Sequence, residues 1–354
     1  MAFKTIKKII ISIIMTSIFI FCLQGANSIL AYKWEYSENI VNRKNQLLDL
    51  PEGTVDVLFT GASATYAGIS PVLMYNNFNI YSFNLATSSQ PPLCVYLNLK
   101  EAIKNSRPKL VVIDFSYLLK DADLKKPKVE PYYQKGYVDI QDPELKKEFI
   151  YHIKEDYPGF DVFSFKLPLY RYHDRWKDLT EKDFEHSPMK ADFLMGSLYR
   201  NAVINIEISP NRMDPLPLTG KNSISESSAK YYNLIIELCR EYDIKIISFI
   251  PPRVAENYER NHYFELYAAE NKIDHLNINL PEHFDIINFD LESDFYDKVH
   301  VNVFGQEKLT NYLGEYLTMY YPEVIGYERE ATPLYDQYYI MYMKYIDKKE
   351  FENE

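Results

Sequence analysis

The chain has 354 residues and a formal net charge of −11, because 50 acidic residues outnumber 39 basic ones. Such a chain lacks the overall basic character that neutralises phosphates, which argues against a nucleic-acid-binding protein. With 47% hydrophobic and 25% charged residues, the composition is that of a globular protein. Cys22, Cys94 and Cys239 are too few and too far apart for a disulfide framework or a zinc site.

Residues 1–32 have the pattern of a membrane-inserted segment. Lys4, Lys7 and Lys8 precede an apolar run that continues to Ala31, and aromatic residues follow it. The run is near the roughly 20 residues that span a bilayer, and the lysines keep the N-terminus in the cytoplasm. No clean small-x-small cleavage site is visible, so the pattern favours an uncleaved signal anchor over a cleaved signal peptide. We therefore predict a single-pass protein of the cell membrane, with the rest of the chain outside the cytoplasm.

The exported part is more acidic than the whole chain. Without the three lysines of the N-terminal segment, the net charge of −11 becomes −14. Residues 33–53 are polar and are interpreted as a stalk, and residues 54–325 as the folded domain.

Short apolar runs alternate with helical patterns in that domain, which predicts an α/β fold with a parallel sheet covered on both faces. The expected strands are residues 55–60, 80–85, 109–114, 244–250 and 276–278. The expected helices are residues 92–104, 226–240, 256–271 and 305–320.

Two segments depart from this alternation. Residues 118–222 are rich in Pro, Tyr, Asp and Lys without a strong period, and we interpret them as an insertion that forms a lid over the sheet edge. Residues 326–354 are aromatic and then charged, which fits either a docking helix or a frayed end.

Two short motifs carry the expected chemistry. Ser63 follows Gly61 directly after the first strand, at the edge where open α/β sheets bind ligands. Far downstream, Asp297 precedes His300 by three residues, so its carboxylate can reach Nδ1 while Nε2 faces a hydroxyl. Ser63, His300 and Asp297 are therefore the expected nucleophile, base and orienting acid of a catalytic triad. Asp294 is a second nearby carboxylate, but the three-residue spacing favours Asp297.

These motifs, in this order around this strand pattern, resemble the SGNH/GDSL hydrolase superfamily over residues 54–320. The sequence is most similar to the branch that contains D-alanyl-lipoteichoic acid biosynthesis protein D and the alginate O-acetylation proteins, on residues 61–71 and 294–305. The resemblance implies a three-layer, flavodoxin-like αβα fold. It also implies the triad roles given above.

The resemblance extends unevenly to the oxyanion hole. The second block of the superfamily matches residues 84–89, with Ser89 in place of its glycine, so the implied hole comprises the backbone N–H groups of Ser63 and Ser89. The third-block asparagine is missing, because Asp-Phe-Ser-Tyr occupies residues 114–117. Ser116 and Tyr117 are the candidate replacements.

Further substrate contacts are expected from polar side chains near these motifs or in the insertion. For Asn302 a helix cap is the alternative, for His173 a structural hydrogen bond, and for Arg253 a solvated loop charge. The histidines lack metal-ligand spacing, so we expect neither metal nor cofactor. The candidate substrate contacts are Asn84, Tyr117, His173, Arg175, Arg253 and Asn302.

Together these features predict a membrane-anchored, extracytoplasmic serine acyltransferase or esterase. Its substrates would be O-acyl groups of a cell-envelope polysaccharide, an exopolysaccharide or a teichoic acid. The resemblance implies a membrane-bound O-acyltransferase as partner. A carbohydrate O-deacetylase is the enzymatic alternative. A non-catalytic polysaccharide-binding scaffold is the other, and the missing third-block asparagine supports it.

Overall fold

The computed structural model describes residues 2–30, 43–126, 128–184, 192–203, 213, 217–254, 256–324 and 332–351. The chain divides into two compact units. The first comprises residues 1–41 and 150–188, and the second comprises residues 42–149 and 189–354.

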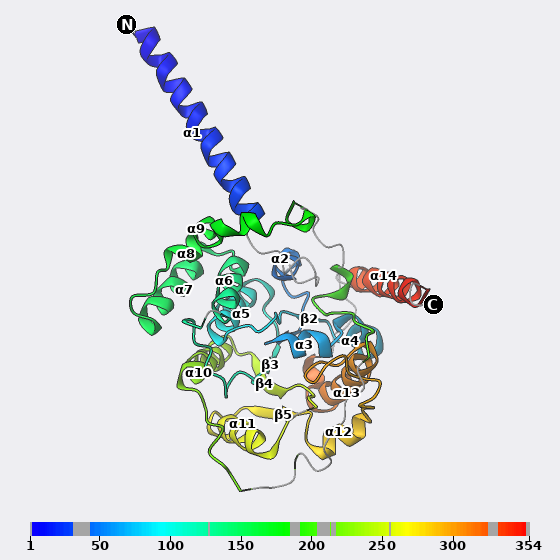
Figure 1. Cartoon of the computed structure of the whole chain (residues 1–354). Coiled ribbons are helices and arrows are strands. Elements are labelled where there is room, and N and C mark those ends of the chain that lie inside the picture. Colours follow the sequence, from blue (N-terminus) through cyan, green and yellow to red (C-terminus); the bar gives the residue numbers. More distant parts are fainter. Residues whose placement is uncertain are drawn as a thin grey trace. The chain divides into compact units, whose positions relative to one another are not determined.

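The second unit is built on a five-stranded parallel sheet with the order β2-β1-β3-β4-β5 (Figure 1). Its strands are β1 (Val57–Thr60), β2 (Ser82–Asn84), β3 (Leu110–Asp114), β4 (Lys245–Ile250) and β5 (Asp274–Asn277). Each lies within or overlaps a strand expected from the sequence, and the predicted α/β fold is confirmed. The chain order changes direction at β1, which puts the ends of β1, β2 and β3 next to one another.

Helices cover both faces of this sheet (Figure 1). On one face, Leu309, Leu313 and Leu317 recur every four residues along α13 and pack in one buried cluster with Phe59 of β1 and Phe249 of β4. Alternate strand residues point to the other face, which α5 and α10 cover. The helices of this unit are α2 (Arg43–Asp49), α3 (Ser63–Gly68), α4 (Pro71–Phe78), α5 (Pro92–Ser106), α6 (Glu130–Asp139), α7 (Pro143–Asp156, which continues into the first unit), α10 (Glu226–Glu241), α11 (Tyr258–Glu270), α12 (Pro281–Ile287), α13 (Val303–Tyr320) and α14 (Thr332–Phe351), with short 3-10 turns η3 (Asp192–Leu194) and η4 (Pro322–Val324).

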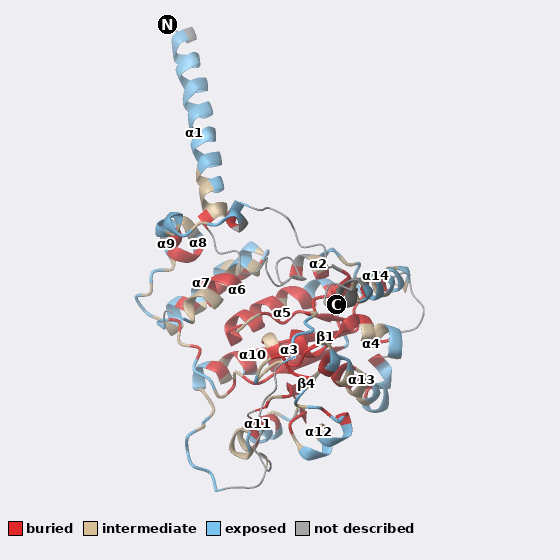
Figure 2. Cartoon of the chain, turned by 45° about the vertical axis from the view of Figure 1, so that its right-hand side comes forward, coloured by how far each residue is buried: buried red, intermediate tan, exposed pale blue. Residues whose placement is uncertain are grey.

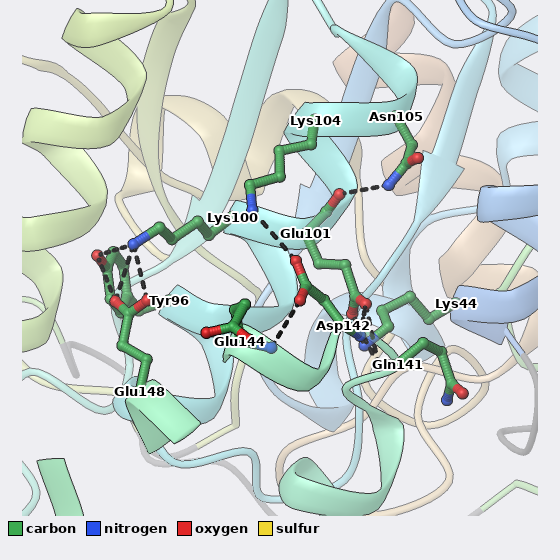
Figure 3. Close-up of polar contacts among 10 residues, drawn as sticks. All are labelled: Lys44, Tyr96, Lys100, Glu101, Lys104, Asn105, Gln141, Asp142, Glu144 and Glu148. Carbon is green, nitrogen blue, oxygen red and sulfur yellow. Dashed lines mark hydrogen bonds and ion pairs between the residues drawn. The ribbon is translucent and has the colours of Figure 1, made fainter. Parts of the chain in front are cut away.

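A buried ion pair fixes α2 to α5 (Figure 3). Lys44 Nζ lies 2.5 Å from the Glu101 carboxylate, and the two side chains are only 6% and 4% exposed. The same carboxylate accepts the backbone N–H groups of Gln141 at 2.9 Å and Asp142 at 2.5 Å, between α6 and α7. Burial lowers the pKa of Lys44, although Glu101 favours its charged form. Part of the segment interpreted as a stalk is therefore packed into the second unit, and residues 31–42 lie outside the described residues.

The segment interpreted as an insertion contributes to both units. Within the second unit, Met195 O accepts a hydrogen bond from Asn84 N at 3.0 Å, and Leu198 N donates to Tyr66 O at 2.9 Å. Residues 192–203 thus run beside β2 and α3, which carry two of the sequence motifs. A lid function for residues 118–222 stays a prediction.

The C-terminal tail forms a packed helix where it is described. Tyr335 of α14 is 1% exposed, and its hydroxyl donates to Ser82 O at 3.2 Å. Of the two alternatives for the tail, this arrangement corresponds to the docking helix.

The first unit contains α1 (Ala2–Leu30) together with α8 (Phe163–Lys166), α9 (Pro168–Tyr172) and the 3-10 turns η1 (His173–Lys177) and η2 (Glu181–Phe184). Residues 4–30 of α1 are long and apolar enough to cross a membrane, a test that a signal sequence would also pass. Figure 2 shows α1 exposed along most of its length.

Candidate active site

Ser63 is held at the end of β1 by a turn that requires glycine. Gly61 has φ +138°, and a Cβ on it would overlap the Cβ of Asp114 on β3. The chain therefore turns sharply after Thr60, and Ser63 becomes the first residue of α3. This turn puts its hydroxyl at the carboxyl ends of the strands.

His300 connects Ser63 with Asp297. Ser63 Oγ lies 2.7 Å from His300 Nε2, and His300 Nδ1 lies 2.8 Å from Asp297 Oδ2. When Nδ1 carries the proton, Nε2 is free to accept the serine proton. Packing thus places the three side chains expected to form the triad within hydrogen-bond distance in series, although Ser63 and His300 are 237 residues apart.

Asp297 is organised by its own loop. Its carboxylate accepts the backbone N–H groups of Val299 at 2.8 Å and His300 at 3.0 Å. Burial raises the pKa of Asp297, but the hydrogen bonds from His300 and Val299 outweigh burial, so this pKa is below its usual value. The other nearby carboxylate, Asp294, instead pairs with Lys308 at 2.7 Å. Asp297 is therefore the carboxylate that orients the imidazole.

Two side chains that the sequence gave no reason to select support His300. The Tyr296 ring stacks on the His300 ring with centroids 5.2 Å apart and an interplanar angle of 1°. The Arg200 guanidinium lies 4.7 Å from the centroid of the Tyr296 ring. Arg200 O also accepts Val303 N at 2.8 Å, at the start of α13. Tyr296 adjoins the Asp297 motif, whereas Arg200 lies in the insertion, where no motif marks it.

Ser89 and Tyr117 lie together beside this turn. Ser89 has φ +45°, the left-handed conformation that glycine adopts most easily, in keeping with the glycine that the resemblance expects there. Thr87 N donates to Gly61 O at 3.2 Å and ties the Ser89 loop to the Ser63 turn. Burial raises the pKa of Tyr117, and a hydrogen bond from Ser89 acts in the opposite direction. The neutral phenol retains a proton that it can donate.

Of the two candidates for the missing asparagine, Tyr117 is better placed. Ser116 is fully buried, and its backbone N–H donates to Asp114 Oδ1 at 2.7 Å. Tyr117 contacts Ser89 directly and is only partly buried.

Asn84 and Asn302 have structural roles in the fold. Asn84 is fully buried, and its side-chain amide donates to Thr65 O in α3 at 3.0 Å. Asn302 caps α13 by accepting the N–H groups of Phe304 and Gly305, and it is 1% exposed. Asn302 therefore acts as the helix cap that was the alternative to a substrate contact. Because both asparagines are buried, neither side chain lines an open site.

Arg253 lies where the loop after β4 meets the histidine loop. Val254 N donates to Lys298 O at 3.0 Å, and Arg253 N donates to Asn279 Oδ1 at 2.7 Å. The positive charge of Arg253 also favours the ionised form of Tyr117. Arg253 thus stays a candidate substrate contact at this edge of the sheet.

His173 and Arg175 belong to the first unit and make contacts there. The His173 side chain is 66% exposed, and its Nδ1 lies 3.0 Å from Tyr170 O. Arg175 is 13% exposed; it donates to Leu30 O at 2.8 Å and pairs with Asp183. Arg175 therefore has a structural role within the first unit. Among the residues that the structure describes, there is no cluster of histidine, cysteine and carboxylate side chains able to hold a metal.

Comparisons with known proteins do not establish a function, so the functional argument rests on the geometry of the site. No family model matches the chain, and no curated protein matches it. Among solved structures, it is similar to a crystal structure from Bacteroides fragilis NCTC 9343 described as a "putative acylhydrolase", with 12% identity and a TM-score of 0.39. That match covers 82% of this chain and 99% of the other. A serine, a histidine and a carboxylate in hydrogen-bonded series at a strand edge are nonetheless the groups that nucleophilic acyl transfer requires.

Proposed function

We propose that this protein is a serine esterase or acyltransferase that acts on O-acyl groups. One observation carries the proposal, namely the hydrogen-bonded series from Ser63 through His300 to Asp297. Side chains from the two ends of the domain meet here in the order that nucleophile activation needs.

In the first half-reaction Ser63 Oγ attacks the acyl carbonyl carbon while His300 Nε2 takes its proton. The backbone N–H groups of Ser63 and Ser89 donate to the oxyanion, and Tyr117 is a third candidate donor. Asp297 stabilises the imidazolium at Nδ1. Collapse of the intermediate passes the proton from Nε2 to the leaving alkoxide and leaves an acyl ester on Ser63.

In the second half-reaction a hydroxyl or water attacks the acyl-Ser63 ester. His300 Nε2 takes the proton of the incoming nucleophile and returns it to Ser63 Oγ as the ester bond breaks. Transfer and hydrolysis therefore share one site and differ only in the nucleophile that enters. A carbohydrate O-deacetylase is the hydrolytic form of the same proposal.

The cell-envelope setting rests on the resemblance and on α1. Residues 4–30 are long and apolar enough to cross a bilayer, which supports a membrane anchor that holds the enzyme at the outer face of the cell membrane. The lack of a clean cleavage site in the sequence favours an uncleaved anchor. A polysaccharide or teichoic acid is the proposed acceptor, and a membrane-bound O-acyltransferase is the proposed partner. A scaffold without catalysis is the second candidate, favoured by the absence of the third-block asparagine at residues 114–117.

A fluorophosphonate probe tests the proposed nucleophile on the full chain in detergent. We expect the wild-type protein to be labelled and to hydrolyse an aryl acetate, and Ser63→Ala to do neither. Ser227→Ala, which removes an exposed hydroxyl bonded to Asp121, is the matched control and should behave as wild type. Equal labelling of the wild type and Ser63→Ala would eliminate Ser63 as the nucleophile. No labelling and no turnover of the wild type would favour the scaffold.

Alkaline extraction of membranes, followed by N-terminal sequencing, tests the anchor. We expect the protein to stay in the membrane pellet with its original N-terminus. A mature N-terminus near residue 27 or 32 would show cleavage and release.

A further inference from the structure

The first unit carries a set of large aromatic side chains exposed to solvent. They come from one segment, residues 160–184, in which seven of 25 residues are aromatic, against 15% in the whole chain. The segment also has a buried side, since Phe165 is 1% exposed. The exposed members are Phe163, Tyr170, Trp176 and Phe184, at 49%, 54%, 64% and 56% exposure.

Hydrogen bonds join this segment to the end of the apolar helix. Leu169 N donates to Asn27 Oδ1 at 2.6 Å, and Arg175 Nη1 donates to Leu30 O at 2.8 Å. Arg175 is itself held by an ion pair with Asp183. The exposed aromatic residues are thus connected to the last turn of α1 by contacts within the first unit.

The length of α1 fixes the level of that last turn in a bilayer. Lys8 is the last lysine before the apolar run of α1, and about 20 helical residues span the hydrocarbon core of a bilayer. Counting from Ile9, such a span ends near Ser28. Asn27 and Leu30, which bind the aromatic segment, therefore lie at the second interface between hydrocarbon and headgroups.

The chemistry of the segment suits that interface. Tryptophan and tyrosine are enriched there, and lysine and arginine also act as interfacial anchors. Lys177 Nζ lies 5.6 Å from the centroid of the Trp176 ring. Residues 160–184 hold five basic and five acidic side chains, so the segment is neutral while the exported part carries −14. Bulk charge therefore does not repel it from anionic lipid.

We propose that residues 160–184 are a membrane-interface segment, in which Phe163, Tyr170, Trp176 and Phe184 insert between lipid headgroups beside the end of α1. This inference rests on the anchoring part of the proposed function and is independent of its chemistry. The segment would hold the chain at the outer surface by a second contact besides the helix.

Trp176 is the natural probe, because the chain has only one other tryptophan, Trp34. The full chain with Trp34→Phe is reconstituted in phosphatidylcholine and phosphatidylglycerol vesicles whose acyl chains carry bromine near either the headgroup or the methyl end. We expect Trp176 to lose most of its fluorescence with bromine near the headgroup, less with deep bromine, and to resist aqueous acrylamide. Tyr170→Trp, in a chain with Trp34→Phe and Trp176→Phe, should place its tryptophan at the same depth in the bilayer.

Tyr320→Trp, in a chain with Trp34→Phe and Trp176→Phe, is the reference for an exposed side chain, since Tyr320 is 61% exposed. Suppose that the protein resists alkaline extraction but that bromine quenches Trp176 no more strongly than this reference. That result would overturn the interface segment and leave the anchor intact. Stronger quenching by deep bromine would also overturn it. Protein released by alkali would overturn the anchor and the interface segment together.

Discussion

Two short segments among the described residues, 296–300 and 172–175, contain a histidine, an aspartate and a tyrosine, and only the first forms a candidate active site. In residues 296–300, His300 is 16% exposed and reaches Ser63, whereas in residues 172–175, His173 is 66% exposed and contacts the nearby Tyr170 carbonyl. The first segment lies at the carboxyl ends of parallel strands, where distant parts of the chain converge. Residue type alone therefore does not distinguish the two, and the difference lies in what the fold brings to each histidine.

The two arginines associated with these segments differ in the same way. Arg175 is committed to Leu30 and Asp183 inside its own unit. Arg200 is exposed and stands over Tyr296, which stacks on His300. Arg175, which was chosen from the sequence, thus has a structural role, whereas Arg200, which was not chosen, lies over the ring that stacks on His300.

Replacing the aspartate in each segment should give the largest contrast. Asp297→Asn removes the charge that holds the imidazole, and loss of this group in serine proteases lowers kcat about 10⁴-fold. We expect a similar loss of aryl acetate hydrolysis. Asp174→Asn, at a 72% exposed position, is the matched control and should keep the wild-type rate. An Asp297→Asn rate within about tenfold of wild type would remove Asp297 from the mechanism.

Arg175→Met should separate stability from catalysis. Asp183 is 5% exposed, and without Arg175 its carboxylate keeps only the hydrogen bonds from Thr180, so the loss of the ion pair should destabilise the first unit. We expect earlier unfolding of the first unit in limited proteolysis, with an unchanged rate per folded molecule. The double variant with Asp183→Asn should recover part of the loss, and resistance equal to wild type in the single variant would contradict the structural role.

A third histidine, His275, predicts a dependence of stability on pH. Burial lowers the pKa of His275 from 6.5 to about 4. Below pH 6.5 the unfolded chain binds a proton at this residue that the folded chain does not, so the free energy of unfolding falls as the pH drops toward 4, by about 3 kcal/mol in total.

Chemical denaturation over this pH range, with His275→Asn as the comparison, checks the effect. The variant should lose this part of the pH dependence, whereas His173→Ala should keep it. Identical pH profiles for His275→Asn and wild type would contradict a His275 that stays neutral in the folded chain down to about pH 4.

Arg200→Ala should have a smaller effect on turnover. An exposed cation over an aromatic ring contributes about 0.5 to 1 kcal/mol, equivalent to roughly a two- to fivefold change in rate. We expect kcat to fall by that factor with KM nearly constant, because Arg200 acts through Tyr296 on His300. Arg200→Lys should restore most of the rate, and a change confined to KM would indicate substrate contact instead.

His173→Ala should have the smallest effect. An exposed side chain with only local contacts contributes within about 0.5 kcal/mol of stability. We expect unchanged thermal unfolding and an unchanged rate of aryl acetate hydrolysis. A marked loss of rate would return His173 to the list of substrate contacts.

The sequence by itself determined the strands of the sheet and the positions of Ser63, Asp297 and His300. Strand assignment needs only a short apolar run and its turn signals, which are local properties of the chain. The Asp297 and His300 pairing is also local, because three residues of loop bring the carboxylate to Nδ1. Ser63 was found because it directly follows a strand whose end lies at the ligand-binding edge of such sheets.

Only the tertiary structure decided which other polar side chains belong to the site. Asn84 and Asn302 are buried and support α3 and α13, whereas Tyr296 stacks on His300 and Arg200 lies over the Tyr296 ring. The same holds for Arg175, whose partner Leu30 is 145 residues away. Burial and long-range contacts depend on how elements pack, and no spacing along the chain encodes them.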